Sequence, residues 1–211
     1  MTVKTFVFNP IQVNTYVLYD ETKKCVIIDA GCMTEKEQYA LSNFIDENRL
    51  EVTHLLNTHL HFDHALGNAF AAERYGVLPL AHQADEHLIA NLLLHAQMFR
   101  VNASVKPQAL GGYLNDGDTL CFGNSELKAI HVPGHSPGSL CFYCEKAGVL
   151  FSGDVLFEEC IGRSDLPGGN YQTLIHGITN KLFVLPETTI VYPGHDVSTT
   201  IGHEKQFNPY F

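Results

Sequence analysis

Three histidines and an aspartate crowd into one short run of the chain, Thr58-His59-Leu60-His61-Phe62-Asp63-His64. All four side chains are metal-binding types, because imidazole suits zinc and iron and a carboxylate adds negative charge and a harder oxygen donor. The run follows an apolar stretch typical of a strand, 52–56, and precedes a segment typical of a helix start, 65–70. Loops where a strand meets a helix are common places for metal chemistry. The sequence therefore predicts a metal site in this loop.

Three later segments also place a histidine or an aspartate directly after a glycine, at the end of an apolar run. They are Pro133-Gly134-His135, Ser152-Gly153-Asp154 and Pro193-Gly194-His195. Glycine permits the positive φ angle or the close backbone approach that a tight turn after a strand requires. We therefore expect these three polar side chains to lie on loops that follow strands.

In combination, these motifs resemble the metallo-β-lactamase fold superfamily, and the resemblance extends from Phe6 to the C-terminus. It implies an α/β fold, an αββα four-layer β-sandwich with outer helices. It also implies two metal sites, one held by His59, His61 and His135 and the other by Asp63, His64 and His195, with Asp154 bridging them.

The cofactors that this resemblance implies are two divalent metal ions, zinc in the first place, with iron or manganese also accepted by such ligands. Bound metals of this kind lower the pKa of water to about 7 and so provide a nucleophile for hydrolysis. Asp63, which would orient the attacking group, and Asp154, which would bridge the metals, are the expected catalytic residues. Thr58 and Ser136 flank ligands and are expected to orient them by hydrogen bonding.

A narrower resemblance is to the hydroxyacylglutathione hydrolases (glyoxalase II), and within them to the short bacterial branch. Two segments carry it, Gly162-Arg163-Ser164-Asp165 after the bridging aspartate and the tail from Thr199 to Pro209. It implies thioester hydrolysis, with S-lactoylglutathione as the first candidate substrate. Arg163 would contact an anionic substrate; the alternative is a local ion pair with Asp165.

The chain departs from the long forms of that family in three ways, the first being that they place a lysine and a tyrosine in the loop that here reads Arg163 and Asp165. Those forms carry a C-terminal helical domain that contributes to glutathione binding, whereas this sequence ends at Phe211. They also have a tyrosine two residues past the last ligand histidine, where this chain has Val197. We expect a single hydrolase domain over residues 1–211, without the glutathione-binding helical domain, and weak glutathione specificity.

Three alternatives share parts of the motif set. A mononuclear iron persulfide dioxygenase would use only two histidines and the aspartate as metal ligands. A hydrolase of another ester, such as a lactone, a β-lactam or a phosphodiester, would use the whole set. A non-catalytic metal-binding scaffold is disfavoured because all seven ligands are present. The start of the sequence lacks a signal segment, which disfavours a β-lactamase, and the acidic balance disfavours a nuclease.

Composition indicates an ordinary globular protein, and the resemblance to glyoxalase II implies a small-molecule thioester as its substrate. The 211 residues are 45% hydrophobic and 17% charged, with a formal charge of −10, which argues against nucleic acid or an anionic membrane as a partner. No apolar run approaches the about 20 residues that span a bilayer, so a cytoplasmic location is expected. The oligomeric state is left open, and the scattered cysteines are expected to be mostly reduced core residues.

Strands are predicted for the apolar runs that turn residues bound, namely 5–8, 14–19, 25–29, 52–57, 77–81, 119–122, 127–131, 140–144, 149–152 and 189–192. Helices are predicted over 66–75, closed by Gly76, over 84–100 and over 171–183. A further helix begins with a capping box of Thr34 and Glu37, and its buried stripe is expected to contain Tyr39, Leu41, Phe44 and Ile45.

Overall fold

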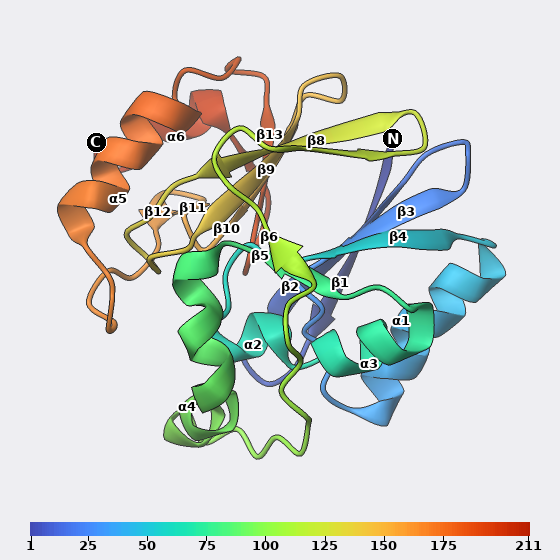
Figure 1. Ribbon diagram of the computed structural model, residues 1–211. Helices are drawn as coiled ribbons and strands as arrows, with labels where there is room; N and C mark the ends of the chain where they lie inside the picture. The colour runs from blue at the N-terminus through green and yellow to red at the C-terminus, as the bar shows by residue number, and fades with distance from the viewer.

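Two six-stranded sheets face each other at the centre of the protein (Figure 1), in a computed structural model that describes residues 1–211. The first sheet has the order β1 (Thr2–Phe8), β2 (Val13–Tyr19), β3 (Lys24–Ile28), β4 (Glu51–Leu56), β5 (Pro79–Ala81) and β6 (Gly112–Tyr113). The second has the order β14 (Thr199–Thr200), β13 (Ile190–Pro193), β10 (Val149–Gly153), β9 (Leu140–Cys144), β8 (Ser125–His131) and β7 (Thr119–Phe122). A separate hairpin pairs β11 (Leu156–Phe157) with β12 (Cys160–Ile161).

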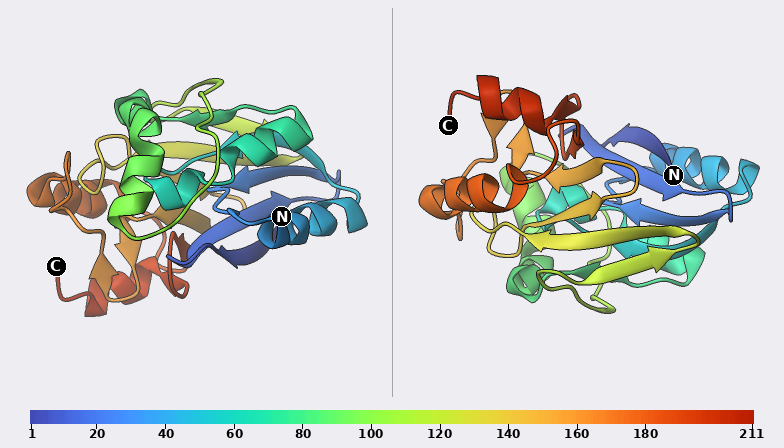
Figure 2. Two further views of the ribbon diagram at one scale, coloured as in Figure 1. Left: turned by 90° about the horizontal axis from the view of Figure 1, so that it is seen from below. Right: turned by 90° about the horizontal axis from the view of Figure 1, so that it is seen from above.

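Helices cover the outer face of each sheet, as Figures 1 and 2 show. Helices α1 (Glu35–Glu47) and α3 (Asn68–Tyr75) pack on the first sheet. On the second sheet lie α5 (Tyr171–Gly177), which continues into the π-helical turn η2 (Ile178–Leu182), and α6 (Ile201–Phe207). The predicted four-layer αββα sandwich is therefore confirmed. No helix has the length and apolar character needed to span a bilayer.

Both faces of each sheet are buried, which explains why its central strands read as continuous apolar runs. In β2, Leu18 packs between the sheets while its neighbour Val17 packs under α1. The same alternation recurs in β3, where Ile28 faces the other sheet and Ile27 faces the helices. Successive side chains of a strand point to opposite faces, so one run of sequence supplies two apolar layers.

Helix α1 begins as the sequence predicts. The Thr34 hydroxyl accepts from the Glu37 backbone N–H at 3.3 Å, and the Glu37 carboxylate accepts from the Thr34 backbone N–H at 2.8 Å. Leu41 and Ile45 are buried, but Tyr39 is 69% exposed, so its assignment to the buried stripe was wrong. A helical stripe is broad enough to fit the sequence in more than one rotation, and packing against the sheet selects one.

Two predicted helices differ from the structure. The segment predicted as one helix over 84–100 is a 3₁₀ segment, η1 (Gln83–Asn91), followed by α4 (Leu92–Met98). In the 3₁₀ segment the buried Asp85 carboxylate accepts from the backbone N–H groups of Leu60 and Gly138, so distant loops constrain this turn. The predicted helix over 66–75 is preceded by a short helix, α2 (Phe62–Ala65), and begins at residue 68.

Candidate metal centre

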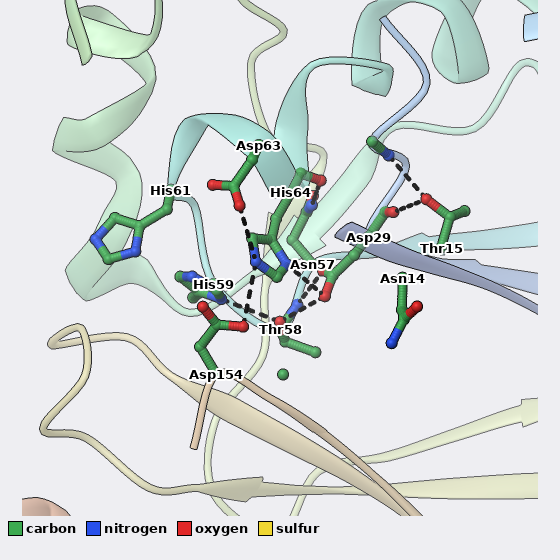
Figure 3. A network of polar contacts seen from close by, with 12 residues as sticks. Asn14, Thr15, Asp29, Asn57, Thr58, His59, His61, Asp63, His64 and Asp154 are labelled. Atoms are coloured by element: carbon green, nitrogen blue, oxygen red, sulfur yellow. Dashed lines mark hydrogen bonds and ion pairs between the residues drawn. The ribbon is translucent and has the colours of Figure 1, made fainter. Parts of the chain in front are cut away.

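Every predicted ligand lies on a loop or helix start that follows the carboxyl end of a strand. The strands are β4, β8, β10 and β13. Strand β10 is parallel to β13, and β8 runs in the same direction because both β8 and β10 are antiparallel to β9. Their carboxyl ends therefore lie at one edge of the second sheet, where the loop that follows β4 of the first sheet meets them (Figure 3).

Three imidazoles converge to form the first group of donor atoms. His61 Nδ1 lies 2.9 Å from His135 Nε2, which in turn lies 3.2 Å from His59 Nε2. His59 and His61 come from the loop after β4, and His135 from the loop after β8. This is the triad that the family resemblance implies for one metal.

The second group consists of Asp63, His64 and His195. The Asp63 Oδ2 atom lies 3.2 Å from His195 Nε2 and 3.6 Å from His64 Nε2. Asp63 and His64 are in α2, which follows directly on the histidine-rich loop. The loop thus supplies ligand candidates to both groups.

Asp154 lies between the two groups. Its Oδ1 is 3.4 Å from His64 Nε2 in the second group, and its Oδ2 is 3.5 Å from His135 Nε2 in the first. Oδ2 also lies 3.6 Å from His195 Nε2. One carboxylate therefore has an oxygen close to members of both groups, as a bridging ligand requires.

The donor set fits a metal on two grounds beyond its composition. The buried atoms His64 Nε2 and Asp154 Oδ1 point toward each other but neither has a hydrogen-bond partner. Buried polar atoms nearly always have partners, and a cation placed between these two would satisfy both. At residue 194, a Cβ atom would lie 2.2 Å from Asp154 Oδ1, so only glycine lets this loop approach the centre.

The outward-facing nitrogens of the histidines are held by groups of the surrounding loops. His64 Nδ1 donates to Asp29 Oδ2 at 2.9 Å, as Figure 3 shows. His135 Nδ1 donates to the Arg163 carbonyl at 2.8 Å, and His195 Nδ1 to the Gln12 carbonyl at 3.2 Å. Such partners fix the ring orientation and leave the other nitrogen free to bind a metal.

Thr58 completes this set as expected. Its hydroxyl donates to Asp29 Oδ2 at 2.6 Å, so its lone pair is available to accept from His59 Nδ1 at 3.1 Å. Ser136 does not do the same, and that expectation was wrong. Its hydroxyl donates to the buried carboxylate of Asp85 at 2.7 Å, which fixes the loop rather than a ligand ring.

Sequence reasoning missed Asp29, the group that orients both His64 and Thr58. It accepts from the Thr58 backbone N–H at 2.7 Å through its second oxygen, and it is only 1% exposed. Its sequence signal was available, because Asp29 closes an apolar strand shortly before Gly31. The same pattern of a strand end near a glycine drew attention to the predicted ligands.

Electrostatics favours neutral imidazoles in the first group. Burial, followed by the neighbouring His64 and His61 rings, holds the pKa of His59 well below its usual range. Burial and the adjacent His135 ring lower the pKa of His61 to about 4. Both rings are thus uncharged near pH 7 and present lone pairs, which is the form that binds metals.

The second group carries concentrated negative charge. Burial alone would raise the pKa of the Asp154 carboxyl, but the adjacent His64 ring outweighs it and holds that pKa well below its usual range. Burial alone would lower the pKa of His64, but Asp63, Asp154 and Asp29 together raise it well above its usual range. The carboxylates therefore draw positive charge to this point, as a proton or as a metal cation.

A cleft of about 300 Å³ opens directly above these groups. Its floor includes five of the predicted ligands, and its walls include His95 of α4 and Arg163. The Arg163 guanidinium donates to both oxygens of Asp165, at 3.0 and 2.9 Å, so the predicted local ion pair is present. A contact of Arg163 with substrate stays a prediction. The other wall residues are apolar: Ile11, Phe62, Leu88, Met98, Phe99, Leu166 and Pro167.

Comparison with known proteins gives matches over nearly the whole chain. The sequence model of the family described as the metallo-beta-lactamase superfamily matches residues 8–195. A curated relative, the hydroxyacylglutathione hydrolase GloC of Haemophilus influenzae, is 34% identical over 218 residues, which cover 100% of this chain and 98% of that protein.

Two solved structures are similar in both sequence and fold. The BLEG-1 B3 metallo-beta-lactamase is 36% identical with a TM-score of 0.90, and the match covers 99% of each chain. TTHA1623, solved in a di-iron-bound form, is 32% identical with a TM-score of 0.87, and the match covers 100% of each chain.

Proposed function

Because this chain belongs to the metallo-beta-lactamase superfamily, we propose that it is a metal-dependent hydrolase with a dinuclear centre that acts on thioesters. The observation that supports two metals best is the position of Asp154, whose carboxylate oxygens lie within 3.6 Å of histidine nitrogens from both groups. The relative named as a hydroxyacylglutathione hydrolase makes S-lactoylglutathione the first substrate to test.

In this proposal His59, His61 and His135 hold one metal, Asp63, His64 and His195 hold the other, and Asp154 binds both. When bound, the metals polarise the substrate carbonyl and lower the pKa of water to about 7. Zinc and iron both suit imidazole and carboxylate ligands, and the di-iron form of the related TTHA1623 favours including iron in any test.

The protein's own side chains contribute position and charge. Asp63 lines the cleft, and its carboxylate accepts a hydrogen bond from the attacking group and so orients it. Burial alone would raise the pKa of Asp63, but the His64 and His195 rings lower it, so the carboxylate is ionised near neutral pH. Asp29, Thr58 and the loop carbonyls hold the imidazoles in place.

The leaving group supports a thioester over an ordinary ester or amide. A thiolate has a pKa near 8.5 and departs with little protonation, whereas an alkoxide or an amide nitrogen needs a proton donor. Apart from the predicted ligands, only His95 and Arg163 among the cleft residues carry a polar side chain. A reaction that requires no dedicated general acid suits such a wall.

The direct test is to load the purified protein with zinc or with iron, measure metal per chain, and assay S-lactoylglutathione. We expect two metals per chain and loss of the thioester without uptake of oxygen. One metal per chain together with oxygen uptake on glutathione persulfide would overturn the proposal in favour of a dioxygenase.

A second candidate function is hydrolysis of a β-lactam, which the 36% identity and 0.90 TM-score to a B3 metallo-beta-lactamase favour. The same metal-loaded protein can be tested with a chromogenic cephalosporin. We expect its kcat/KM on the cephalosporin to lie well below that on the thioester, because the departing nitrogen needs a proton donor and His95 is the one imidazole of the wall outside the predicted ligands that could supply it. The reverse order would make β-lactams the substrate class.

A further inference from the structure

The wall of the cleft is almost entirely apolar. Seven of its nine side chains outside the predicted ligand set are apolar, and they come from separate parts of the chain: the turn after β1, α2, the η1–α4 segment and the loop after β12. No lysine, serine, threonine, asparagine or tyrosine lines it. The wall therefore offers burial to a substrate and very few hydrogen bonds.

Two of these apolar side chains are unusually exposed. Met98 is 72% exposed and Phe99 is 46% exposed, and both stand at the end of α4 beside the cleft. The Phe99 ring packs on the buried Phe62 ring at 5.4 Å between centroids, which keeps Phe99 in place. Exposed apolar side chains gathered at a binding cleft are a mark of an apolar ligand.

Apart from the metals that the floor would hold, the wall of the cleft offers few partners to an anionic ligand group. Arg163 is the one residue of the wall with a permanent positive charge, and its Nε and Nη2 atoms already donate to the carboxylate of Asp165. The chain as a whole has a formal charge of −10, which repels anions such as the glutathione moiety.

We infer that the substrate carries an uncharged, apolar group beyond its reacting bond, and that Phe62, Met98 and Phe99 bind this group. This inference rests on the proposed thioesterase function and narrows it to thioesters with apolar acyl or thiol groups. The glutathione thioester would then be hydrolysed, but as a poor member of the series.

The first measurement compares matched thioesters on the metal-loaded protein. The first pair consists of the hexanoyl and acetyl thioesters of N-acetylcysteamine, which differ only in the acyl group. The second pair consists of the acetyl thioesters of benzyl thiol and of glutathione, which differ only in the thiol. Each methylene that becomes buried is worth about fourfold in kcat/KM, so we expect a preference of at least about tenfold for the apolar member in at least one pair. Equal rates in both pairs, or a preference for glutathione, would overturn the inference.

The second measurement separates this inference from the proposed function. S-hexyl and S-methyl thioethers of N-acetylcysteamine cannot be hydrolysed, and their binding is measured by calorimetry. Tighter binding of the hexyl compound without turnover of any thioester would support the apolar cleft and reject the thioesterase. Turnover of thioesters together with equal binding of the two thioethers would support the thioesterase function and reject the apolar binding cleft.

A pair of variants in α4 locates the effect. Met98→Gln keeps the length of the side chain and adds an amide, so the hexanoyl-to-acetyl ratio of kcat/KM should fall at least about threefold. Leu94→Gln is the matched control, because Leu94 is 56% exposed on the same helix but does not line the cleft. An unchanged ratio in Met98→Gln, or an equal fall in both variants, would overturn the assignment.

Arg163→Ala adds a further check, since a selective loss of kcat/KM on the glutathione thioester would show recognition of charge instead.

Discussion

At the scale of single residues, the centre depends on groups that touch no substrate. Three carboxylates surround His64. Asp29 lies against its Nδ1 atom, and Asp63 and Asp154 lie near its Nε2 atom. A ring held in this way cannot turn, and the lone pair that it offers a metal has a fixed direction. Asp63 and Asp154, which lie near Nε2, would bind the same metal as His64.

Replacement of Asp154 tests the bridge. Asp154→Ala removes a shared negative charge, so at least one metal per chain should be lost. Turnover should fall by more than the 10–100-fold that loss of an outer partner costs. The check is metal analysis beside the thioester assay, with Asp46→Ala as a control carboxylate in an exposed position that does not line the cleft. A variant that kept two metals and near-normal rates would contradict the bridging role.

Replacement of Asp29 tests the orienting role that the structure adds. Asp29→Asn turns an acceptor of two N–H groups and a hydroxyl into a partial donor, so affinity for metal should fall about 10–100-fold while the ligands themselves stay intact. Competition with a chromogenic chelator measures this. Asp46→Asn, which alters an exposed ion pair with Arg74, is the matched control. Equal affinities in the two variants would assign Asp29 a purely structural role.

At the scale of elements, the start of α1 is linked to the metal centre through Asn9. The Glu37 carboxylate accepts from the Asn9 backbone N–H at 2.6 Å and from that of Met33 at 2.9 Å. The Asn9 side chain then donates to the Asp63 carbonyl at 3.0 Å. The helix cap, the turn after β1 and α2 thus form one hydrogen-bonded unit.

This unit has a predictable dependence on pH. Burial alone would raise the pKa of Glu37, but the Thr34 and Asn9 N–H groups outweigh it and lower that pKa. A lowered pKa in the folded state means that the stabilisation is fully present above about pH 4.5 and is lost as the pH falls through the lowered value. Glu37→Gln should therefore lower the free energy of unfolding by about 1–2 kcal/mol at pH 7 and by much less at pH 3.

Urea titration of both proteins at the two pH values gives this difference, and Glu35→Gln in the same first turn is the control. The comparison between wild type and variant cancels the acid sensitivity of the other groups. A loss of equal size at both pH values would mean that the Glu37 charge contributes nothing.

At the scale of the whole molecule, the centre joins the two halves of the sandwich. Its donor atoms come from the loop after β4 in the first sheet and from the loops after β8, β10 and β13 in the second. Elsewhere the sheets meet through an apolar layer that includes Phe142 and Phe151 and through hydrogen bonds, such as that from the Tyr16 hydroxyl to the Pro193 carbonyl at 2.6 Å. A bound metal would therefore connect loops from both sheets.

Removal of metal should for this reason destabilise the entire fold. A ligand present at 1,000 times its Kd stabilises the folded state by about 4 kcal/mol, and each kcal/mol is worth about 2–4 °C in a chain of this size. We expect a chelator to lower Tm by about 10 °C and added zinc, but not magnesium, to restore it. An unchanged Tm in protein shown by analysis to be metal-free would contradict this.

Sequence alone predicted which residues would bind the metals, and it placed most of the elements from which those residues project. The metal-binding types cluster in short motifs at the ends of apolar runs, and both signals are local, so neither requires knowledge of the fold. The ten longer strands were predicted for the same reason, whereas the two-residue strands β6, β11, β12 and β14 were not predicted. The helix over 84–100 failed because its conformation depends on the Asp85 carboxylate, which is held by Leu60 and Gly138 from elsewhere in the chain.

Tertiary structure alone decided how the ligand groups are oriented and what kind of molecule fits above them. Asp29, the Gln12 carbonyl and the Arg163 carbonyl hold three different rings, yet the bonded partners are 28 to 183 residues apart in the chain. The apolar wall likewise joins Ile11, Phe62 and Leu166. Nothing in their own segments marks Ile11, Phe62 or Leu166 as residues of a cleft wall. Only the meeting of strand ends at one edge makes them neighbours, because such contacts depend on distance in space and leave no periodic pattern along the chain.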